Sequence, residues 1–266
     1  MGLYEIKYLQ FKLFQKYPDL VHGVFTRSGG VSKGSFDSLN IGNNSGDDLS
    51  SVSENRKRIL AQMGTKQAVF LNQVHGKEIL VIKKHGDSCL PTFFSDKENR
   101  ENPVSADGIV TDMAGISMVI QVADCQAILL FDPEKKVIAN VHCGWQGSVE
   151  NIISNCIDVM IKKFQCRPEY ILAGISPSLG PCCAEFINFQ DEIPRALWEY
   201  KEQDRPFFDF WKISRDQLME KGVGKENIEI MNICTKCNTD KFFSFRQEKT
   251  TGRFACVLAL NKIAKG

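Results

Sequence analysis

Nine short runs of apolar and β-branched residues recur along this chain and limit the folds open to it. They lie at residues 68–74, 78–84, 108–113, 116–124, 125–132, 137–143, 170–176, 228–234 and 253–260. Runs of this length and composition predict β-strands. Few helical patterns accompany them, so the sequence predicts an α+β fold in which layered, mixed β-sheets are flanked by helices.

The clearest helical pattern covers residues 148–165. Apolar side chains recur there with the i, i+3, i+4, i+7 spacing of an amphipathic helix. Ser148 stands at the expected N-cap, and Lys162 and Lys163 stand near the C-terminus, where cations are favourable. The pattern predicts one continuous helix that packs on a sheet.

Two shorter helices are predicted at residues 53–64 and 214–223, each opened by a serine cap. No repeat or low-complexity linker divides the chain, and residues 93–105 are interpreted as a long surface loop. We therefore predict one catalytic domain covering residues 1–266.

Charge and cysteine usage exclude several classes of protein. Lys and Arg total 33 against 32 for Asp and Glu, so the net charge of +1 provides no general attraction for nucleic acid or an anionic membrane. The N-terminal segment has no uninterrupted apolar core, so we expect neither a signal peptide nor a membrane span, and a cytoplasmic location. The ten cysteines are then expected to be thiols or metal ligands rather than disulfides.

Two cysteine pairs raise the question of a structural zinc cluster. Cys234 and Cys237, in CTKC, have the spacing of a zinc-ligand pair. Adjacent Cys182 and Cys183 suit chelation less well. We interpret the four as core or loop thiols.

The stretch QVADCQAILLFDPEKKVIANVHCGWQG, at 121–147, indicates chemistry within a hairpin. If Phe131 pairs with Lys136 across the DPEK turn, Cys125 stands directly opposite His142, with Cβ atoms roughly 4.5–5.5 Å apart. A zinc ion fits between a thiolate and an imidazole at that spacing.

A third ligand must come from the few remaining histidines. His75 ends a strand-like run and suits this role, whereas His22 and His85 are interpreted as turn or surface residues. Three such ligands with one open position describe a catalytic zinc site. Spacing alone leaves open the alternative of a core cysteine and a hydrogen-bonded histidine.

Eight ordered blocks carry a family resemblance that spans residue 22 to about residue 256. They are HGVFTRSGGVSKGSFDSLNIG, ENR, NQVHG, SADGIVT, VADCQAILLFD, VHCGWQGS, GISPSLGPCCAEF and FFSFRQEKTTGRFA. Together they resemble the purine nucleoside phosphorylase family formerly called laccase-like multicopper polyphenol oxidases. The resemblance implies an α+β fold and a zinc site made by His75, Cys125 and His142.

The resemblance also implies the activity. Members phosphorolyse adenosine, inosine, guanosine and methylthioadenosine with inorganic phosphate, and hydrolytically deaminate adenosine. The expected partners are thus small purine nucleosides and phosphate. Arg27, Arg56 and Arg246 lie in family blocks and are candidates to bind phosphate. Backbone amides of Gly29-Gly30 and of the helix after Gly147 are further candidate anion donors.

Three positions bear on how the site would work. Asp124 is a candidate general acid/base or partner of the metal site, and equally a structural, hydrogen-bonded carboxylate. Gln146 stands where the family usually has Arg, so it can donate to a substrate oxygen but adds no charge. Cys143 replaces a usual Ala and would add a thiol if exposed.

Rival functions remain open at this stage. Two histidines and a cysteine can also bind copper, but a multicopper laccase needs about eight imidazoles, and the chain has four. Copper substituting for zinc could still support weak phenol oxidation. A thiol hydrolase would use Cys125 as nucleophile and His142 as base. A non-enzymatic binding protein would keep the fold without turnover.

Overall fold

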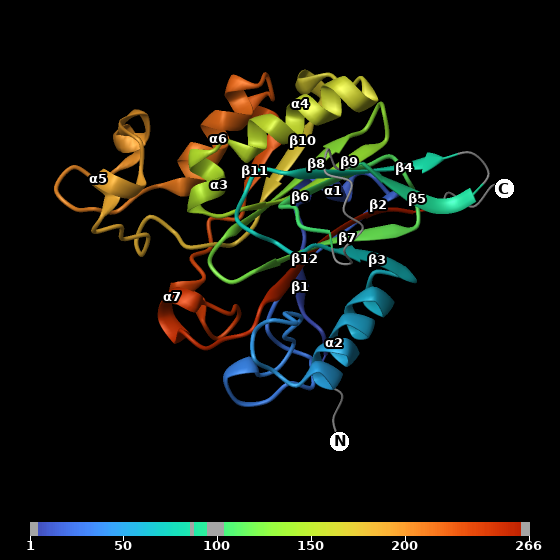
Figure 1. Cartoon of the computed structure of the whole chain (residues 1–266), viewed down its shortest axis with the longest axis horizontal. Helices are drawn as coiled ribbons and strands as arrows, with labels where there is room; N and C mark the ends of the chain where they lie inside the picture. The colour runs from blue at the N-terminus through green and yellow to red at the C-terminus, as the bar shows by residue number, and fades with distance from the viewer. Residues whose placement is uncertain (1–4, 86–87, 95–103, 262–266) are drawn as a thin grey trace.

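Two stacked β-sheets form the centre of the protein, as the computed structural model shows for residues 5–85, 88–94 and 104–261 (Figure 1). The five-stranded sheet has the order β1 (Tyr8–Leu9), β2 (Leu20–Phe25), β12 (Phe254–Leu260), β7 (Ile116–Val122), β3 (Gln67–Phe70). The seven-stranded sheet has the order β11 (Ile228–Ile230), β10 (Leu172–Ile175), β8 (Gln126–Asp132), β9 (Val137–Cys143), β6 (Gly108–Thr111), β4 (Ile79–His85), β5 (Ser88–Phe94). Both sheets mix parallel and antiparallel pairs.

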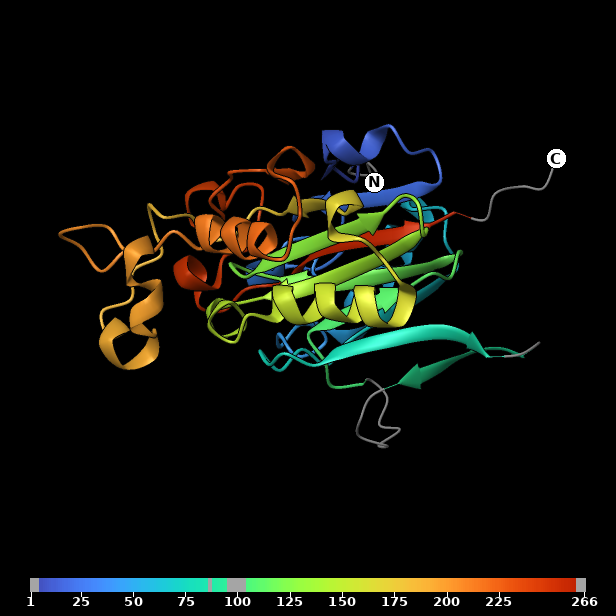
Figure 2. The ribbon, with the colours of Figure 1, turned by 90° about the horizontal axis from the view of Figure 1, so that it is seen from above.

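Helices cover the outer faces of the two sheets (Figures 1 and 2). Helix α4 (Ile152–Phe164) and Leu218 of α6 (Phe210–Glu220) pack on the seven-stranded sheet, and Ile59 of α2 (Leu49–Gln62) packs on the five-stranded sheet. A third apolar cluster fills the space between the sheets and takes residues from both. The prediction of an α+β fold with layered mixed sheets and flanking helices is confirmed.

Strand β12 shows how the sequence encodes this layering. Phe254, Cys256 and Leu258 belong to the cluster between the sheets, whereas Ala255 and Val257 belong to the cluster under α2. Successive side chains of a strand point to opposite faces. A strand buried on both faces is therefore apolar at every position, which is why the expected strand at 253–260 has no polar alternation.

The expected helix at 148–165 is wrong at its start, because the chain forms two helices there. Helix α3 (Trp145–Val149) precedes α4, and Asn151 between them has φ +55°. The Asn151 side chain accepts a hydrogen bond from the Ser154 N–H at 3.1 Å, so Asn151 is the N-cap. Asn tolerates the left-handed conformation and caps well, which explains the break. Ser148, the predicted cap, is buried inside α3.

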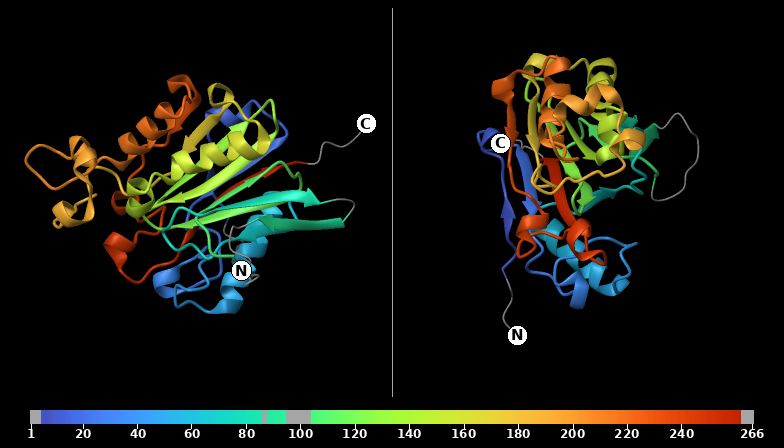
Figure 3. Two further views of the ribbon diagram at one scale, coloured as in Figure 1. Left: turned by 45° about the horizontal axis from the view of Figure 1, so that its top comes forward. Right: turned by 90° about the vertical axis from the view of Figure 1, so that its left-hand side faces the viewer.

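The two other expected helices begin earlier than predicted. Asp48 caps α2 and Asp209 caps α6, each through its carboxylate. Short helical segments complete the described elements: α1 (Lys12–Gln15), α5 (Phe189–Glu192), α7 (Phe245–Glu248), η1 (Gly34–Phe36), η2 (Pro168–Tyr170), η3 (Arg195–Tyr200), η4 (Lys225–Asn227) and η5 (Lys236–Asn238). The segment around α5 projects from the body of the protein (Figure 3). None of the described helices is long and apolar enough to cross a membrane.

Strand β2 was not expected, and it corrects the interpretation of His22. His22 is only 1% exposed, and its Nε2 accepts a hydrogen bond from the Phe11 N–H at 2.9 Å. Burial lowers the pKa of His22 to about 4, with the Phe11 hydrogen bond acting in the opposite direction. His22 is therefore a neutral core residue. Most of the expected loop at 93–105 lies outside the described residues, and the single domain over 1–266 stays a prediction.

Candidate metal centre and cleft

The β8–β9 hairpin brings Cys125 near His142, but in a register different from the one predicted. Ala127, not Cys125, is the strand partner of His142, and Asp132 pairs with Val137. The turn keeps four residues but lies one residue later, at 133–136, where the Asp132 carboxylate accepts the N–H groups of Glu134 and Lys135 at 2.9 Å. The shift is two residues, and side chains alternate with a period of two. Cys125 therefore keeps the predicted side while lying diagonal to His142 instead of opposite it.

Three donor atoms converge at the end of the hairpin where β8 begins and β9 ends. One ligand atom each from His75, Cys125 and His142 lies within 4.8 Å of the others. The Cys125 Sγ is 3.9 Å from the His75 Nε2, and the two imidazole rings are 4.8 Å apart at an angle of 78°. Zinc bonds of about 2.3 Å to sulfur and about 2.0 Å to nitrogen would separate tetrahedral S and N ligands by about 3.6 Å. The three side chains thus fit one metal ion with small adjustments.

Asp107, which was not singled out in the sequence, organises both histidines. Its Oδ1 lies 2.8 Å from the His142 Nδ1, which leaves the Nε2 atom for a metal. Its carboxylate also accepts backbone N–H groups from His75 at 3.0 Å and Gly76 at 2.8 Å. His75 has φ +60°, an unfavourable conformation for a side chain other than Gly or Asn. Asp107 thereby stabilises the turn that presents His75 and fixes the tautomer of His142.

The charges of these groups favour a thiolate at Cys125. Burial raises the pKa of the Cys125 thiol, but His142 and His75 lower it by more, so the net pKa is about 6. Burial lowers the pKa of His142, but the Cys125 thiolate and the Asp107 carboxylate raise it to about 9. Burial raises the pKa of Asp107, but His142 and the N–H groups of Gly76 and His75 together lower it below its usual value. A thiolate is the form of cysteine that binds metals and attacks electrophiles.

Gly144 lets the chain pass close to these donors. A Cβ atom at this position would lie 3.1 Å from the Cys125 Sγ and 3.1 Å from the His75 Cδ2. The backbone of Gly144 is extended, with φ −78°, so any residue could adopt its conformation. Glycine is needed here for space next to two donor side chains.

A cleft of about 1220 Å³ opens above the three donors. This volume exceeds that of a pocket for one drug-sized ligand, which is typically about 300–1,000 Å³. Its wall contains His75, Cys125 and His142, three arginines, and several aromatic rings, namely Phe70, Trp145, Phe186, Phe210 and Phe245. Phe245 is 51% exposed, so its ring is accessible from the cleft. The cleft can hold a flat, partly apolar molecule together with an anion.

The arginines of the cleft differ in part from those expected. Arg56 and Arg246 line it, and so does Arg253, which sequence reasoning missed although it stands in the block TTGRFA. Arg56 binds the Ile41 carbonyl, Arg246 the Glu185 carbonyl and Arg253 the carbonyls of Thr251 and Gly252. Within the part of the chain that the structure describes, none of the three pairs with a carboxylate. Their positive charges remain available for an anionic ligand.

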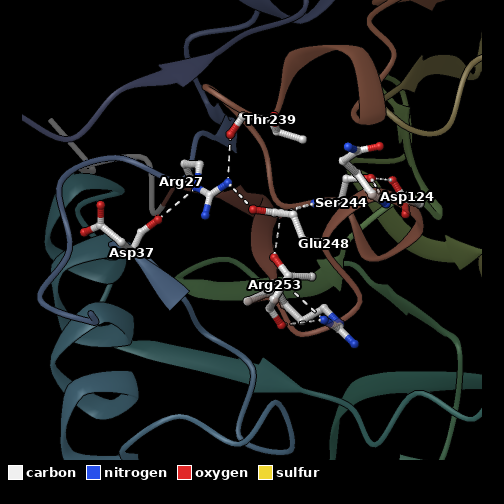
Figure 4. Close-up of polar contacts among 10 residues, drawn as sticks. Arg27, Asp37, Asp124, Thr239, Ser244, Glu248 and Arg253 are labelled. Atoms are coloured by element: carbon white, nitrogen blue, oxygen red, sulfur yellow. Dashed lines mark hydrogen bonds and ion pairs between the residues drawn. The ribbon is translucent and has the colours of Figure 1, made fainter. Parts of the chain in front are cut away.

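The structure does not bring Arg27 to the cleft. Its guanidinium forms an ion pair with Glu248 at 2.9 Å and donates to the carbonyls of Thr239 and Asp37 (Figure 4). The nearby Gly30 N–H donates to the Ser38 hydroxyl at 3.0 Å. These groups join loops of the chain instead of facing the metal centre, so the contacts of Arg27 do not support the expected phosphate role.

Asp124 is held in place by hydrogen bonds from three residues. Its carboxylate accepts from the Thr235 hydroxyl at 2.6 Å, the Ser244 hydroxyl at 2.7 Å and the Arg246 N–H at 2.6 Å. Figure 4 shows Asp124 beside Ser244. Its φ of +89° interrupts the chain between β7 and β8, so strand alternation does not fix where the side chain points. These contacts resemble those of a structural carboxylate that positions the neighbouring Cys125 and Arg246.

Gln146 and Cys143 occupy different environments near the centre. Gln146 is exposed on α3 and lines the cleft, so its amide can reach a ligand. Cys143 is 2% exposed, its Sγ lies 3.3 Å from the Ser148 hydroxyl, and burial raises its pKa to about 12. It is a buried, protonated thiol rather than an additional reactive group. The helix expected after Gly147 begins instead at Trp145, and α3 is too short to form an anion site at its N-terminus.

Comparisons with known proteins find similar proteins that cover most of the chain. The family described as multi-copper polyphenol oxidoreductase laccase matches residues 21–261. A Bacteroides thetaiotaomicron protein named purine nucleoside phosphorylase is 30% identical over 249 residues, which cover 90% of each chain. Geobacillus stearothermophilus purine nucleoside phosphorylase YlmD is 30% identical over 88% of this chain and 87% of its own. The crystal structure of YlmD from that organism superposes with a TM-score of 0.82, at 27% identity, over 98% of this chain and 100% of its own.

Proposed function

Because the chain belongs to the multi-copper polyphenol oxidoreductase laccase family, in which the relatives above are named purine nucleoside phosphorylases, we propose that it is a zinc-dependent purine nucleoside phosphorylase. The observation that carries this proposal is the joining of two features in one cleft. Three donors for a catalytic metal lie at its base, and its walls hold three arginines that pair with no carboxylate among the described residues. A phosphorylase needs both a reaction centre and an anion site.

The donor set supports zinc as the resident metal. A thiolate and two imidazoles are common zinc ligands, and three protein ligands leave one coordination position open, as in catalytic zinc sites. Asp107 on the far nitrogen of His142 is the carboxylate–histidine arrangement that orients such ligands. A zinc ion bound there would supply Lewis acidity and lower the pKa of water to about 7.

The arginines support phosphate as co-substrate. In phosphorolysis a phosphate oxygen forms a bond to C1′ of the ribose while the bond from C1′ to the purine nitrogen breaks. The base leaves with the electron pair and takes up a proton, and ribose 1-phosphate remains. Arg56, Arg246 and Arg253 can hold the phosphate dianion next to the sugar by charge-assisted hydrogen bonds. The Gln146 amide can donate to a sugar or phosphate oxygen.

The aromatic wall supports a purine base. Phe245 is exposed at the cleft and Trp145 is partly buried there, so both rings can stack on a planar heterocycle. We propose adenosine, inosine, guanosine and methylthioadenosine as substrates. The cleft volume of about 1220 Å³ accommodates a nucleoside and phosphate together.

We further propose hydrolytic deamination of adenosine at the same centre. In this reaction water adds to the purine carbon that carries the amino group, and ammonia leaves. Asp124 would act by positioning, because its oxygens already accept hydrogen bonds from Thr235, Ser244 and Arg246. Because Cys125 directly follows Asp124 in the chain, we expect an Asp124→Asn variant to displace Cys125 and thereby to alter turnover.

Incubation with inosine tests the proposal. We expect hypoxanthine release that requires phosphate and yields an equal amount of ribose 1-phosphate. His75→Ala, Cys125→Ala and His142→Ala should each lose activity and the zinc bound at this centre, whereas the surface variant Asp112→Ala should keep both. A folded, zinc-loaded protein that releases no hypoxanthine from inosine, while a reference phosphorylase works in the same buffer, would refute phosphorolysis.

A thiol hydrolase is the second candidate, because the Cys125 pKa of about 6 beside His142 suits a nucleophilic thiolate. It predicts activity that survives a strong chelator and disappears on alkylation. The zinc enzyme predicts loss with chelator and recovery with Zn²⁺. Phenol oxidation that appears only after loading with Cu²⁺ would mark copper as a substitute in the same site.

We also propose that the protein acts in the cytoplasm. All nine cysteines whose state the structure describes are free thiols, and thiols persist in reducing compartments. Measuring the free thiols of the protein in freshly lysed cells tests this, because a secreted protein would be oxidised.

A further inference from the structure

A second group of sulfur atoms lies outside the metal centre described above. The Sγ atoms of Cys182, Cys183, Cys234 and Cys237 lie within 4.8 Å of one another. The Cys237 Sγ is 3.5 Å from that of Cys183 and 3.8 Å from that of Cys182. The first two cysteines follow β10 in the chain, and the other two follow β11. Two loops that are distant in sequence therefore present four thiols to one point.

Core packing does not explain this convergence. A structural cysteine is normally buried as a small apolar residue. Cys182 and Cys237 are exposed, Cys183 is half-buried, and only Cys234 is buried. None of the four belongs to the apolar clusters formed by the described residues.

We propose that these four cysteines bind a zinc ion that is structural and separate from the catalytic one. Four thiolates at about 2.3 Å from a tetrahedral zinc lie about 3.8 Å from each other, which matches the two contacts made by Cys237. Cys234 and Cys237 have the C-x2-C spacing of zinc knuckles. Four protein ligands close the coordination sphere, as in structural sites.

The adjacency of Cys182 and Cys183, which argued against chelation in the sequence, is resolved by the local backbone. The N–H groups of Cys183 and Ala184 both bind the Gly180 carbonyl, at 2.9 and 3.0 Å. This tight turn directs both neighbouring thiols toward Cys237. Gly180 also lets the two loops approach, because a Cβ atom there would lie 3.0 Å from the Cys234 Cβ.

The cluster joins two segments that hold the wall of the cleft. The Leu179 N–H donates to the Asp124 carbonyl at 2.8 Å, and the Thr235 hydroxyl donates to the Asp124 carboxylate at 2.6 Å. The segments also bind each other, since the Thr235 N–H donates to the Ser178 carbonyl at 2.9 Å. Asp124 immediately precedes Cys125. A metal at the four cysteines would thus fix the loops that position one ligand of the catalytic centre.

Metal analysis of the full chain, purified with reductant and with Zn²⁺ as the only added metal, tests the proposal. We expect two zinc ions per chain in the unaltered protein. Cys237→Ser and Cys182→Ser should each reduce this to one, and so should Cys125→Ser, which removes a ligand of the other centre. Cys125→Ser combined with Cys237→Ser should hold none.

X-ray absorption at the zinc edge keeps the test valid if Cys182→Ser and Cys237→Ser fold poorly, because it is measured on Cys125→Ser, in which the four cysteines are unchanged. The zinc that remains in Cys125→Ser should be surrounded by four sulfur atoms and no nitrogen. Nitrogen in that coordination sphere, two zinc ions in Cys237→Ser, iron instead of zinc, or a Cys182–Cys237 disulfide in the reduced preparation would each overturn the proposal. Loss of zinc only from Cys125→Ser would leave the catalytic proposal standing and remove this one.

Discussion

Replacing Asp107 by Asn should weaken zinc binding without removing any of its three ligands. The buried carboxylate accepts four hydrogen bonds, from the His142 Nδ1 and the N–H groups of Val74, His75 and Gly76. An amide of the same shape keeps only one acceptor oxygen. In one orientation its NH2 faces the N–H groups of Val74 and Gly76. In the other it faces His142 and selects the tautomer whose metal-binding nitrogen is protonated.

Either orientation of the amide in Asp107→Asn is expected to reduce both the zinc affinity and the folding stability. Altering the partner of a metal-bound histidine typically lowers metal affinity about 10–100-fold, which is about 1.4–2.7 kcal/mol. Leaving a buried N–H unsatisfied costs a further ~1–3 kcal/mol of folding stability. Competition for Zn²⁺ with a chelator of known affinity, at a temperature where circular dichroism shows the variant folded, measures the first effect. Thermal unfolding measures the second.

Asp112→Asn is the matched control, because Asp112 is an exposed carboxylate just beyond the end of the same strand, β6. It should bind zinc as the unaltered protein does. A folded Asp107→Asn protein with zinc affinity within twofold of the unaltered protein would show that the Asp107 contact does not orient His142. The role assigned to this carboxylate would then be wrong.

Three further predictions concern other parts of the molecule. Gly144→Ala should weaken zinc binding on the order of tenfold in the same competition assay. The reason is that the added Cβ would lie only 3.1 Å from the Cys125 Sγ. Unchanged affinity would mean that the donors can shift freely. His22 has a pKa of about 4 when folded and 6.5 when unfolded, so its neutral state stabilises the fold fully above pH 6.5 and less as pH falls toward 4. The free energy of unfolding in urea should drop by about 2 kcal/mol more between pH 7.5 and 5 than in a His22→Gln variant; equal pH slopes would contradict this. Arg246→Gln should raise the KM for phosphate about 10–100-fold, because a charge-assisted hydrogen bond is lost. The control Arg205→Gln breaks an exposed ion pair with Glu202 and should leave this KM unchanged. Equal effects of the two variants would place the phosphate elsewhere.

The layered fold could be predicted because strand signals act locally. Each of the nine expected runs overlaps one of the described strands, and β12 shows why fully apolar runs are recognisable even without alternation. Boundaries were less predictable because they depend on single capping side chains. Asn151 divides the expected helix at 148–165, and its left-handed conformation leaves no periodic signal in the sequence.

The candidate metal centre also had a part that the sequence could predict and a part that it could not. His75, Cys125 and His142 could be nominated because cysteine and histidine have few roles in a buried hairpin, and the structure brings them together. The register was wrong by two residues because the four-residue turn lies at 133–136 instead of 132–135, where the Asp132 carboxylate binds the N–H groups of Glu134 and Lys135. The error did not alter the face of Cys125, since only an odd shift exchanges faces. Asp107 escaped notice because a lone Asp before a strand gives no sign of its distant partners.

Two ligands of the candidate metal centre adjoin backbone positions that ordinary residues avoid, and each is held by a carboxylate. His75 itself has φ +60°, and its turn donates three N–H groups to Asp107. Asp124, next to Cys125, has φ +89°, and its own carboxylate binds Thr235, Ser244 and Arg246. Such conformations cost about 1–3 kcal/mol each and persist only where surrounding contacts impose them. All of these contacts are made within the protein chain, so they hold the donor-bearing backbone themselves, and less of the binding energy of a metal would be lost to ordering it.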